Sequence, residues 1–255
     1  MTTTSREREP LLLLHGLGGS RVVWEPVIGL LEAERAVTVL DMPGFGAAPP
    51  LPDGVEPSAA NLAAAVHAHC EDLGLDRPHV AGNSLGAWVA LEMGREGWAA
   101  SVTCLSPAGL WRAPLGPRRR DPQRWARRLR PLVSLALRLH GPREAMLRTF
   151  AGHPERIPVQ TGRALVLGWI DASGYSGANR AMRTGLFDPS AYPQGVPVTI
   201  AWGELDRLVG PPKPNRRPAG ARFLTLPDVG HTPTWDDPEL VARILLEGST
   251  VSAPA

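Results

Sequence analysis

The chain has 255 residues, 43% of them hydrophobic, and a formal net charge of +2 at neutral pH. This length can bury a sizeable core in one domain with an insertion or in two small domains. No apolar run approaches the roughly 20 residues of a membrane-spanning helix, and the run at 11–14 is too short for a secretory signal segment, so we expect a cytoplasmic protein with no membrane span. Two isolated cysteines, Cys70 and Cys104, and histidines without ligand spacing indicate no disulfide framework, no metal and no other cofactor.

Six short apolar runs predict β-strands at 10–16, 36–42, 79–84, 101–107, 196–203 and 222–228. The clearest runs are continuously apolar, which is typical of parallel strands covered on both faces. Helical patterns lie between them at about 22–33, 58–74, 85–97 and 237–247, and Ser58 is the expected N-cap of the second. This alternation predicts an α/β fold, with a mostly parallel sheet of about six strands flanked by helices.

The alternation stops between residues 108 and 194. This stretch predicts helices at 121–141, with Asp121 as the cap, and at 142–150, 159–173 and 176–187. We therefore expect a core formed by residues 1–107 and 195–255, interrupted by a helical cap at 108–194.

Positive charge is concentrated in this insertion. Between Arg112 and Arg148 there are eleven arginines but two acids, Asp121 and Glu144, which is a net excess of nine. We interpret them mainly as solvated helix faces. The alternative is attraction of an anionic substrate or surface. No groove-reading motif accompanies the arginines, so we expect no nucleic-acid partner.

The fragment GNSLG, from Gly82 to Gly86, places a serine between two glycines directly after a predicted strand. A serine held at a sharp strand-to-helix turn has strained backbone geometry, and side chains two positions before and after it would collide with neighbouring elements. Ser84 is therefore the candidate nucleophile. The alternative is an ordinary glycine-rich loop, because this short pattern also occurs by chance.

Two further polar residues follow later strands. Asp206 lies after the strand at 196–203, and His231 lies after the strand at 222–228. Because carboxyl ends of parallel strands gather at one edge of a sheet, both side chains are expected near Ser84, in the order nucleophile, acid, base. Glu204 is the second choice for the acid, and Asp228 is interpreted as a turn former. His231 could instead cap the helix that follows it.

Backbone N–H groups are expected to bind the oxyanion of an acyl-transfer reaction. One belongs to Leu85, which follows Ser84 at a helix N-terminus, and the other to Leu17, in the glycine-rich loop after the first strand. Asp41 is interpreted as a structural residue that binds loop amides. The candidate residues of the substrate pocket are Trp111, Trp125, Trp169 and Trp235.

The fragments LLLLHGLGGS, VLDMPGFGAAP, VAGNSLGAW, AWGELDRLV and LPDVGHTPTWDDPELV together resemble the α/β-hydrolase superfamily, in the branch with a helical cap. This resemblance implies that Ser84 is the nucleophile, His231 the base and Asp206 the acid that orients it. Ser84 separates the chain from the haloalkane dehalogenase and epoxide hydrolase branches, whose nucleophile is an aspartate. The GNS fragment and Trp235 resemble the meta-cleavage product hydrolases, although Ala87 stands where those enzymes usually have a glycine.

The chain departs from the family pattern at two places. Nine residues precede the first predicted strand, where the family has an antiparallel pair of strands, so we expect a shortened sheet with the strand at 36–42 at or near an edge. The proline-rich stretch 208–220 is expected to be irregular where the family often has a helix.

These observations predict a serine hydrolase that cleaves a carboxylic ester or similar acyl bond of a small, mainly apolar molecule through an acyl-enzyme. Two alternatives stay open. One is hydrolysis of a carbon–carbon bond, as in the meta-cleavage product hydrolases. The other is a ligand-binding protein with a little-used triad, because fold alone does not settle function. The sequence does not indicate the oligomeric state.

Overall fold

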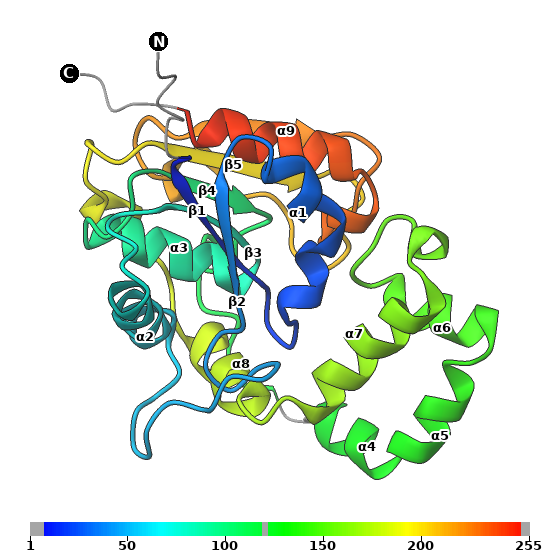
Figure 1. Cartoon of the computed structure of the whole chain (residues 1–255). Helices are drawn as coiled ribbons and strands as arrows, with labels where there is room; N and C mark the ends of the chain where they lie inside the picture. The colour runs from blue at the N-terminus through cyan, green and yellow to red at the C-terminus, as the bar shows by residue number, and fades with distance from the viewer. Residues whose placement is uncertain (1–7, 119–121, 251–255) are drawn as a thin grey trace.

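The computed structural model describes residues 8–118 and 122–250 and contains a six-stranded parallel sheet (Figure 1). Its strands are β1 (Pro10–Leu14), β2 (Ala36–Leu40), β3 (His79–Asn83), β4 (Val102–Leu105), β5 (Val198–Gly203) and β6 (Arg222–Leu226). The spatial order is β2-β1-β3-β4-β5-β6, and every neighbouring pair is parallel. All six predicted strands are therefore present, each somewhat shorter than the sequence pattern.

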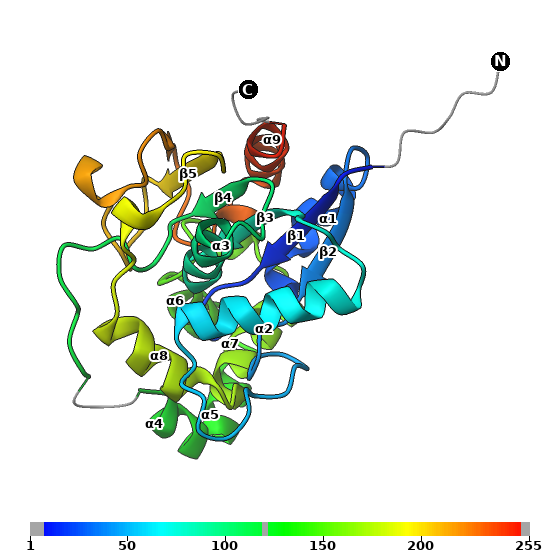
Figure 2. The ribbon, with the colours of Figure 1, turned by 90° about the vertical axis from the view of Figure 1, so that its left-hand side faces the viewer.

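Helices cover both faces of the sheet (Figures 1 and 2). On one face lie α1 (Glu25–Leu31) and α9 (Pro238–Gly248), and on the other lie α2 (Ala59–Asp72) and α3 (Leu85–Arg95). Successive side chains of β1 point to opposite faces. Leu11 and Leu13 pack with α1 and α9, whereas Leu12 and Leu14 pack with α2 and α3. A strand buried on both sides thus requires the unbroken run of leucines.

The strand β2 forms one edge of the sheet, the position expected for the strand at 36–42. Its residues are exposed or half-buried, in contrast to the buried leucines of β1 beside it. The remaining edge strand, β6, has the same mixed burial. Ser84 follows β3 and Asp206 follows β5, two strands in the interior of the sheet, whereas His231 follows the edge strand β6.

The segment between β4 and β5 contains α4 (Pro122–Arg128), α5 (Arg130–Ala136), α6 (His140–Leu147), α7 (Val159–Asp171) and α8 (Tyr175–Thr184). The prediction of a single helix at 121–141 is wrong. The helix breaks at Leu129, because Pro131 has no backbone N–H and is tolerated only in the first turn of a new helix, which begins at Arg130. The predicted cap residue Asp121 lies outside the described residues.

Two local expectations, at Ser58 and in the stretch 208–220, were met. The Ser58 hydroxyl accepts the backbone N–H of Asn61 at 3.2 Å and caps α2. The proline-rich stretch 208–220 contains a short 3-10 turn, Pro214–Arg216, and no α-helix. Cys70 and Cys104 are buried and free. Across residues 8–118 and 122–250, no helix has both the length and the apolar character needed to cross a membrane.

His15, at the end of β1, is a fully buried histidine with both ring nitrogens engaged. Its Nε2 accepts the backbone N–H of Met42 at 3.0 Å, so Nδ1 carries the proton and donates to the Gly16 carbonyl at 2.8 Å. Burial lowers the pKa of His15 below its ordinary value of 6.5, by more than the Gly16 bond and the charge of Asp41 raise it. The folded chain therefore holds this imidazole neutral.

We expect the free energy of unfolding to fall as the pH decreases below about 6.5, because the unfolded chain binds a proton on His15 that the folded chain excludes. Each pH unit in that range costs at most about 1.4 kcal/mol for one such group. Urea unfolding of the native chain and of His15→Gln, at about pH 7.5 and about pH 5.5, measures this effect. The glutamine keeps an acceptor but does not titrate, so equal pH dependence in both proteins would contradict the assignment.

Candidate active site

Ser84 occupies the turn between β3 and α3 with backbone angles φ 56° and ψ −113°. Residues with a Cβ rarely adopt positive φ, because the Cβ crowds the backbone there. A Cβ on Gly82 would lie 2.3 Å from the backbone of Gly86. A Cβ on Gly86 would lie 2.4 Å from the carbonyl oxygens of Leu14 and His15 in the neighbouring segment. Close backbone approach therefore requires both glycines, for the steric reason predicted from the sequence.

Asp206 and His231 form a buried hydrogen-bonded pair. The Nδ1–H of His231 donates to Oδ2 of Asp206 at 2.7 Å, and the two side chains are 5% and 1% exposed. Oδ1 of Asp206 accepts the backbone N–H groups of Leu208 and Val209 at 2.8 and 3.0 Å. Burial would raise the pKa of Asp206, but the hydrogen bond and electrostatic attraction of the His231 ring, with these two amides, hold that pKa below its ordinary value. The tautomer fixed in this way leaves Nε2 of His231 as an acceptor.

The other acids near this pair have different surroundings. Glu204, the second choice for the acid, is exposed. Asp228 has a positive φ of 56°, as expected of a turn former, and its carboxylate lies 3.0 Å from Nε2 of His153. The geometry therefore favours Asp206 as the partner of His231.

Two further alternatives are also resolved by hydrogen bonds. Asp237 accepts the N–H of Leu240 at 2.9 Å, so this aspartate, and not His231, caps α9. Asp41 accepts two backbone N–H groups of neighbouring loops at 2.7 and 3.0 Å, which confirms the structural role expected for it.

A cavity of about 590 Å³ lies beside the Asp206–His231 pair, between the sheet and the insertion. The predicted site residues that line it are Leu17, Ser84, Trp111, Trp169, His231 and Trp235. The prediction that Trp125 lines it is wrong. This side chain is 59% exposed on α4, with the Arg128 guanidinium 5.4 Å from its ring centre, because the register of α4 turns the neighbouring Ala126 toward the cavity instead.

Leu17 and Leu85, the expected sources of the oxyanion N–H groups, come from two different segments next to the serine. Leu85 is the first residue of α3, next to Ser84 in the chain. Leu17 belongs to the loop after β1, and a Cβ on Gly16 would lie 3.2 Å from the Cβ of Ser84. The loop thus passes directly beside the serine.

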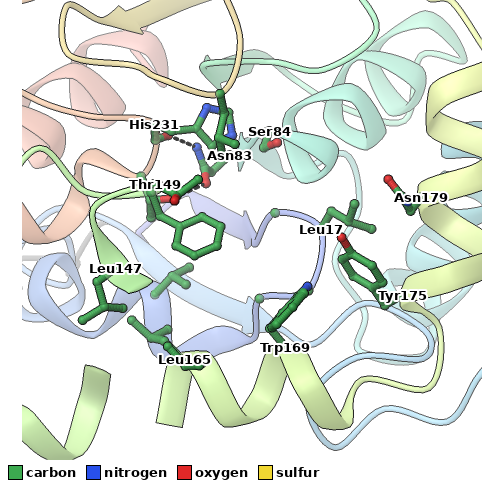
Figure 3. Close-up of a pocket in the computed structure, with 18 of the residues that line it drawn as sticks. Leu17, Asn83, Ser84, Leu147, Thr149, Leu165, Trp169, Tyr175, Asn179 and His231 are labelled. Carbon is green, nitrogen blue, oxygen red and sulfur yellow. Dashed lines mark hydrogen bonds between the residues drawn. The ribbon is translucent and has the colours of Figure 1, made fainter. Parts of the chain in front are cut away.

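The flanks of the cavity differ in polarity (Figure 3). Leu147 and Leu165 lie on one flank, and Tyr175 and Asn179 lie on the other. No motif surrounds these four residues, which belong to helices of the insertion, so nothing in the sequence pointed to them. Among the residues that the structure describes, no group of three or more His, Cys, Asp or Glu side chains is arranged to hold a metal ion.

Asn83, directly before the candidate nucleophile, ties the loop of His231 to the sheet. Its Nδ2 donates to the carbonyl oxygen of His231 at 2.7 Å (Figure 3) and to that of Leu105 at 3.1 Å. Its Oδ1 accepts the hydroxyl of Thr232 at 3.2 Å. The side chain is buried, so each bond is shielded from water. Asn83 stands within the GNS fragment, but nothing in the sequence indicated this role for it.

Asp236 is a second positioning residue that the sequence analysis missed. Its buried carboxylate accepts three backbone N–H groups, from Gly230 at 2.7 Å, Gly152 at 2.9 Å and His153 at 2.8 Å. Gly230 directly precedes His231, whereas Gly152 and His153 belong to the insertion. One carboxylate thus fixes the loop of the candidate base against the insertion.

We expect Asp236→Asn to destabilise the fold by about 1–3 kcal/mol, because an amide NH₂ would face a buried backbone N–H that loses its acceptor. We also expect kcat on an ester substrate to fall by about tenfold, since the loop of His231 loses its anchor. Urea unfolding and steady-state kinetics measure the two effects. The control is Asp237→Asn, the same change one residue later, where asparagine caps α9 as well as aspartate does. Equal behaviour of the two variants would contradict the role of Asp236.

The comparisons with known proteins concern the family and the fold of the chain. Residues 11–244 match the model of the Alpha/beta hydrolase family. The chain is 28% identical over 214 residues to epoxide hydrolase EphH of Mycobacterium tuberculosis, which covers 74% of this chain and 93% of that protein. It is 27% identical over 252 residues to an acetyltransferase component of the acetoin cleaving system of Pseudomonas putida, which covers 93% of this chain and 62% of that protein.

Solved structures show the same fold. The enol-lactonase from Burkholderia xenovorans LB400 superposes with a TM-score of 0.77 at 19% identity, covering 97% of this chain and 94% of that one. A serine hydrolase involved in carbazole degradation, CarC, superposes with a TM-score of 0.71 at 18% identity, covering 96% and 92%. The expected α/β-hydrolase fold is thereby confirmed, and the chain belongs to the alpha/beta hydrolase family.

Proposed function

We propose that this hydrolase cleaves a carboxylic ester or a similar acyl bond of a small, mainly apolar molecule through an acyl-enzyme. One observation carries the proposal. The 2.7 Å hydrogen bond from His231 to Asp206 presents an acceptor nitrogen in the same cavity that Ser84 lines. A hydroxyl, a base and an acid that orients the base are the groups that nucleophilic acyl transfer requires.

In the proposed mechanism, Ser84 attacks the carbonyl carbon of the ester while Nε2 of His231 takes its proton. Asp206 stays ionised and stabilises the imidazolium, which its lowered pKa favours. His231 then protonates the departing alkoxide, and an acyl group remains on Ser84. Water attacks the acyl-enzyme with His231 again as base, which releases the acid and restores the serine.

The backbone N–H groups of Leu17 and Leu85 would bind the oxyanion. Leu85 supports this role because the first N–H groups of an α-helix have no partner within the helix and carry positive partial charge. The same role fits Leu17, because the loop that contains it passes beside Ser84. One donor of this kind contributes about 10²- to 10³-fold to turnover.

We assign residues 108–194 as a cap over a core of residues 1–107 and 195–255. The cap would set specificity, because α7 and α8 supply much of the cavity wall. Leu147 and Leu165 would contact the apolar acyl part of the substrate. Tyr175 and Asn179 offer hydrogen bonds to a polar group on the leaving side.

Hydrolysis of a carbon–carbon bond is the second candidate. Trp235, one of the residues behind the resemblance to the meta-cleavage product hydrolases, lines the cavity. Ring-cleaved dienone substrates distinguish the two activities, because an ordinary esterase should leave them intact. The name of EphH states that that protein opens epoxides. The nucleophile of the epoxide hydrolase branch is an aspartate, whereas this chain has Ser84, so we favour ester cleavage over epoxide opening.

Labelling with a fluorophosphonate tests the proposal. We expect one adduct, on the peptide that contains Ser84, and no adduct on Ser84→Ala. A panel of chromogenic esters graded by acyl chain length then measures turnover and specificity. Absence of an adduct on the native chain, or full esterase turnover by Ser84→Ala, would overturn the mechanism.

A further inference from the structure

The outer side of α4 and α5 carries a stripe of exposed apolar side chains. We call it the outer stripe, and its members are Trp125, Leu129, Leu132, Leu135 and Leu139, which are 59%, 48%, 65%, 60% and 62% exposed. The spacing of four, three and three residues from Trp125 to Leu135 is that of one helical face, and Leu139 follows α5 as the N-cap residue of α6. Single exposed leucines are ordinary on protein surfaces, but a continuous apolar patch marks an interaction site.

The stripe is not the core-facing side of these helices. Ala126 and Val133 of the same segment line the cavity, and Leu137 is fully buried. Helical hydrogen bonds from Leu129 to Trp125 and from Val133 to Leu129 continue across the junction of α4 and α5, so the outer stripe keeps its alignment. Figures 1 and 2 place both helices at the end of the molecule away from α9. The segment therefore has two apolar faces, one of them uncovered.

Positive charge borders the stripe. Residues 122–143 include six arginines and no aspartate or glutamate, and Asp121 and Glu144 flank this stretch. Arg127 donates to carbonyl groups at the end of α7, and Arg130 pairs with an aspartate of α7. Arg124, Arg128 and Arg138 are exposed beside the leucines. Such a surface complements a partner that is both apolar and negatively charged.

We propose that the outer stripe, with Arg124, Arg128 and Arg138, binds an anionic phospholipid surface. Leucines would enter the boundary of the acyl chains, and arginines would reach phosphates through their long stems. Tryptophan is favoured at the headgroup level, where Trp125 would lie. A second copy of the chain fits less well, because a symmetric contact would bring the arginines of both faces together. This binding does not depend on the catalytic role proposed for Ser84.

Sedimentation with lipid vesicles tests the contribution of the apolar side chains to binding. We expect the native chain to sediment with vesicles of phosphatidylcholine mixed with phosphatidylglycerol, but not with phosphatidylcholine alone, and we expect added salt to weaken binding. The double variant Leu132→Ser/Leu135→Ser should lower the partition coefficient by at least about tenfold. The matched control, Val55→Ser/Leu73→Ser, changes exposed residues elsewhere and should bind as the native chain does.

A second pair of variants tests the charges. Replacing Arg124, Arg128 and Arg138 with glutamine should weaken binding by about 100-fold. Replacing Arg8, Arg180 and Arg243, which are exposed elsewhere, removes the same charge and should have a much smaller effect. Urea unfolding midpoints of all variants check that they fold.

Three outcomes would overturn the proposal. The first is no sedimentation of the native chain with the anionic vesicles. The second is equal binding to both kinds of vesicle. The third is a concentration-dependent dimer in sedimentation equilibrium that Leu132→Ser/Leu135→Ser abolishes while vesicle binding is unchanged, which would assign the outer stripe to a second copy.

Discussion

Replacing Asp206 with asparagine should lower kcat for a chromogenic butyrate ester by about 10⁴-fold while the chain stays folded. The amide oxygen can still accept the N–H groups of Leu208 and Val209, which turns the NH₂ toward Nδ1 of His231. Nδ1 must then become an acceptor, so the proton moves to Nε2. In that tautomer the imidazole cannot take the proton of Ser84.

Glu204→Gln provides the matched control for this experiment. It makes the same chemical change two residues earlier, on an exposed side chain that the sequence left as a rival for the acid. We expect its kcat to equal that of the native chain within about twofold, as for other exposed changes away from the reaction. Loss of turnover in Glu204→Gln, with full turnover in Asp206→Asn, would reverse the assignment.

The second large effect is on stability, at a glycine of the serine turn. Gly86→Ala should reduce the free energy of unfolding by about 3 kcal/mol, because the new Cβ meets two backbone carbonyl oxygens that cannot rotate away. The strand end at Leu14 and the start of α3 would have to separate. We therefore expect the turn to widen and esterase activity to fall as well. Urea unfolding measures the loss.

Gly29→Ala is the control, since Gly29 lies inside α1 with nothing within 4 Å of its Cβ position. Alanine is favoured over glycine in a helix, so this variant should be more stable by about 0.5–1 kcal/mol. The free energy of unfolding should therefore decrease in Gly86→Ala and increase in Gly29→Ala. An unfolding midpoint of Gly86→Ala equal to that of the native chain would contradict the close approach described for this turn.

The sheet could be predicted from the sequence because a parallel strand covered on both faces has to be continuously apolar. The leucines of β1 and the run at β5 show this pattern directly. The helices of the insertion were harder to place. At 121–141 the apolar and arginine residues continue a helical pattern through Pro131, and the pattern does not show where the proline divides it. The lengths of the strands were also overestimated, because apolar residues continue from the strands into the loops.

The candidate site was predicted to the extent that its residues follow strands. Ser84, Asp206 and His231 each lie just after a strand end, and the topology of a parallel sheet brings such positions together. The roles of Asn83 and Asp236 depend on partners far away in the chain, which one sequence cannot show. Trp125 was misplaced because α4 is apolar on two sides, so composition does not indicate which side faces inward.

The bonds of Asp236 also bear on how substrate reaches the cavity. Swinging residues 150–153 away from the loop of His231 as one lid would strip the amides of Gly152 and His153 of their acceptor, Asp236, and break the bond from the Thr232 N–H to the Phe150 carbonyl. Uncovering such groups together is far costlier than shifting a short helix. We therefore expect the contact between residues 150–153 and the loop of His231 to stay closed. The entrance to the cavity would then open by rearrangement of helices on the opposite side.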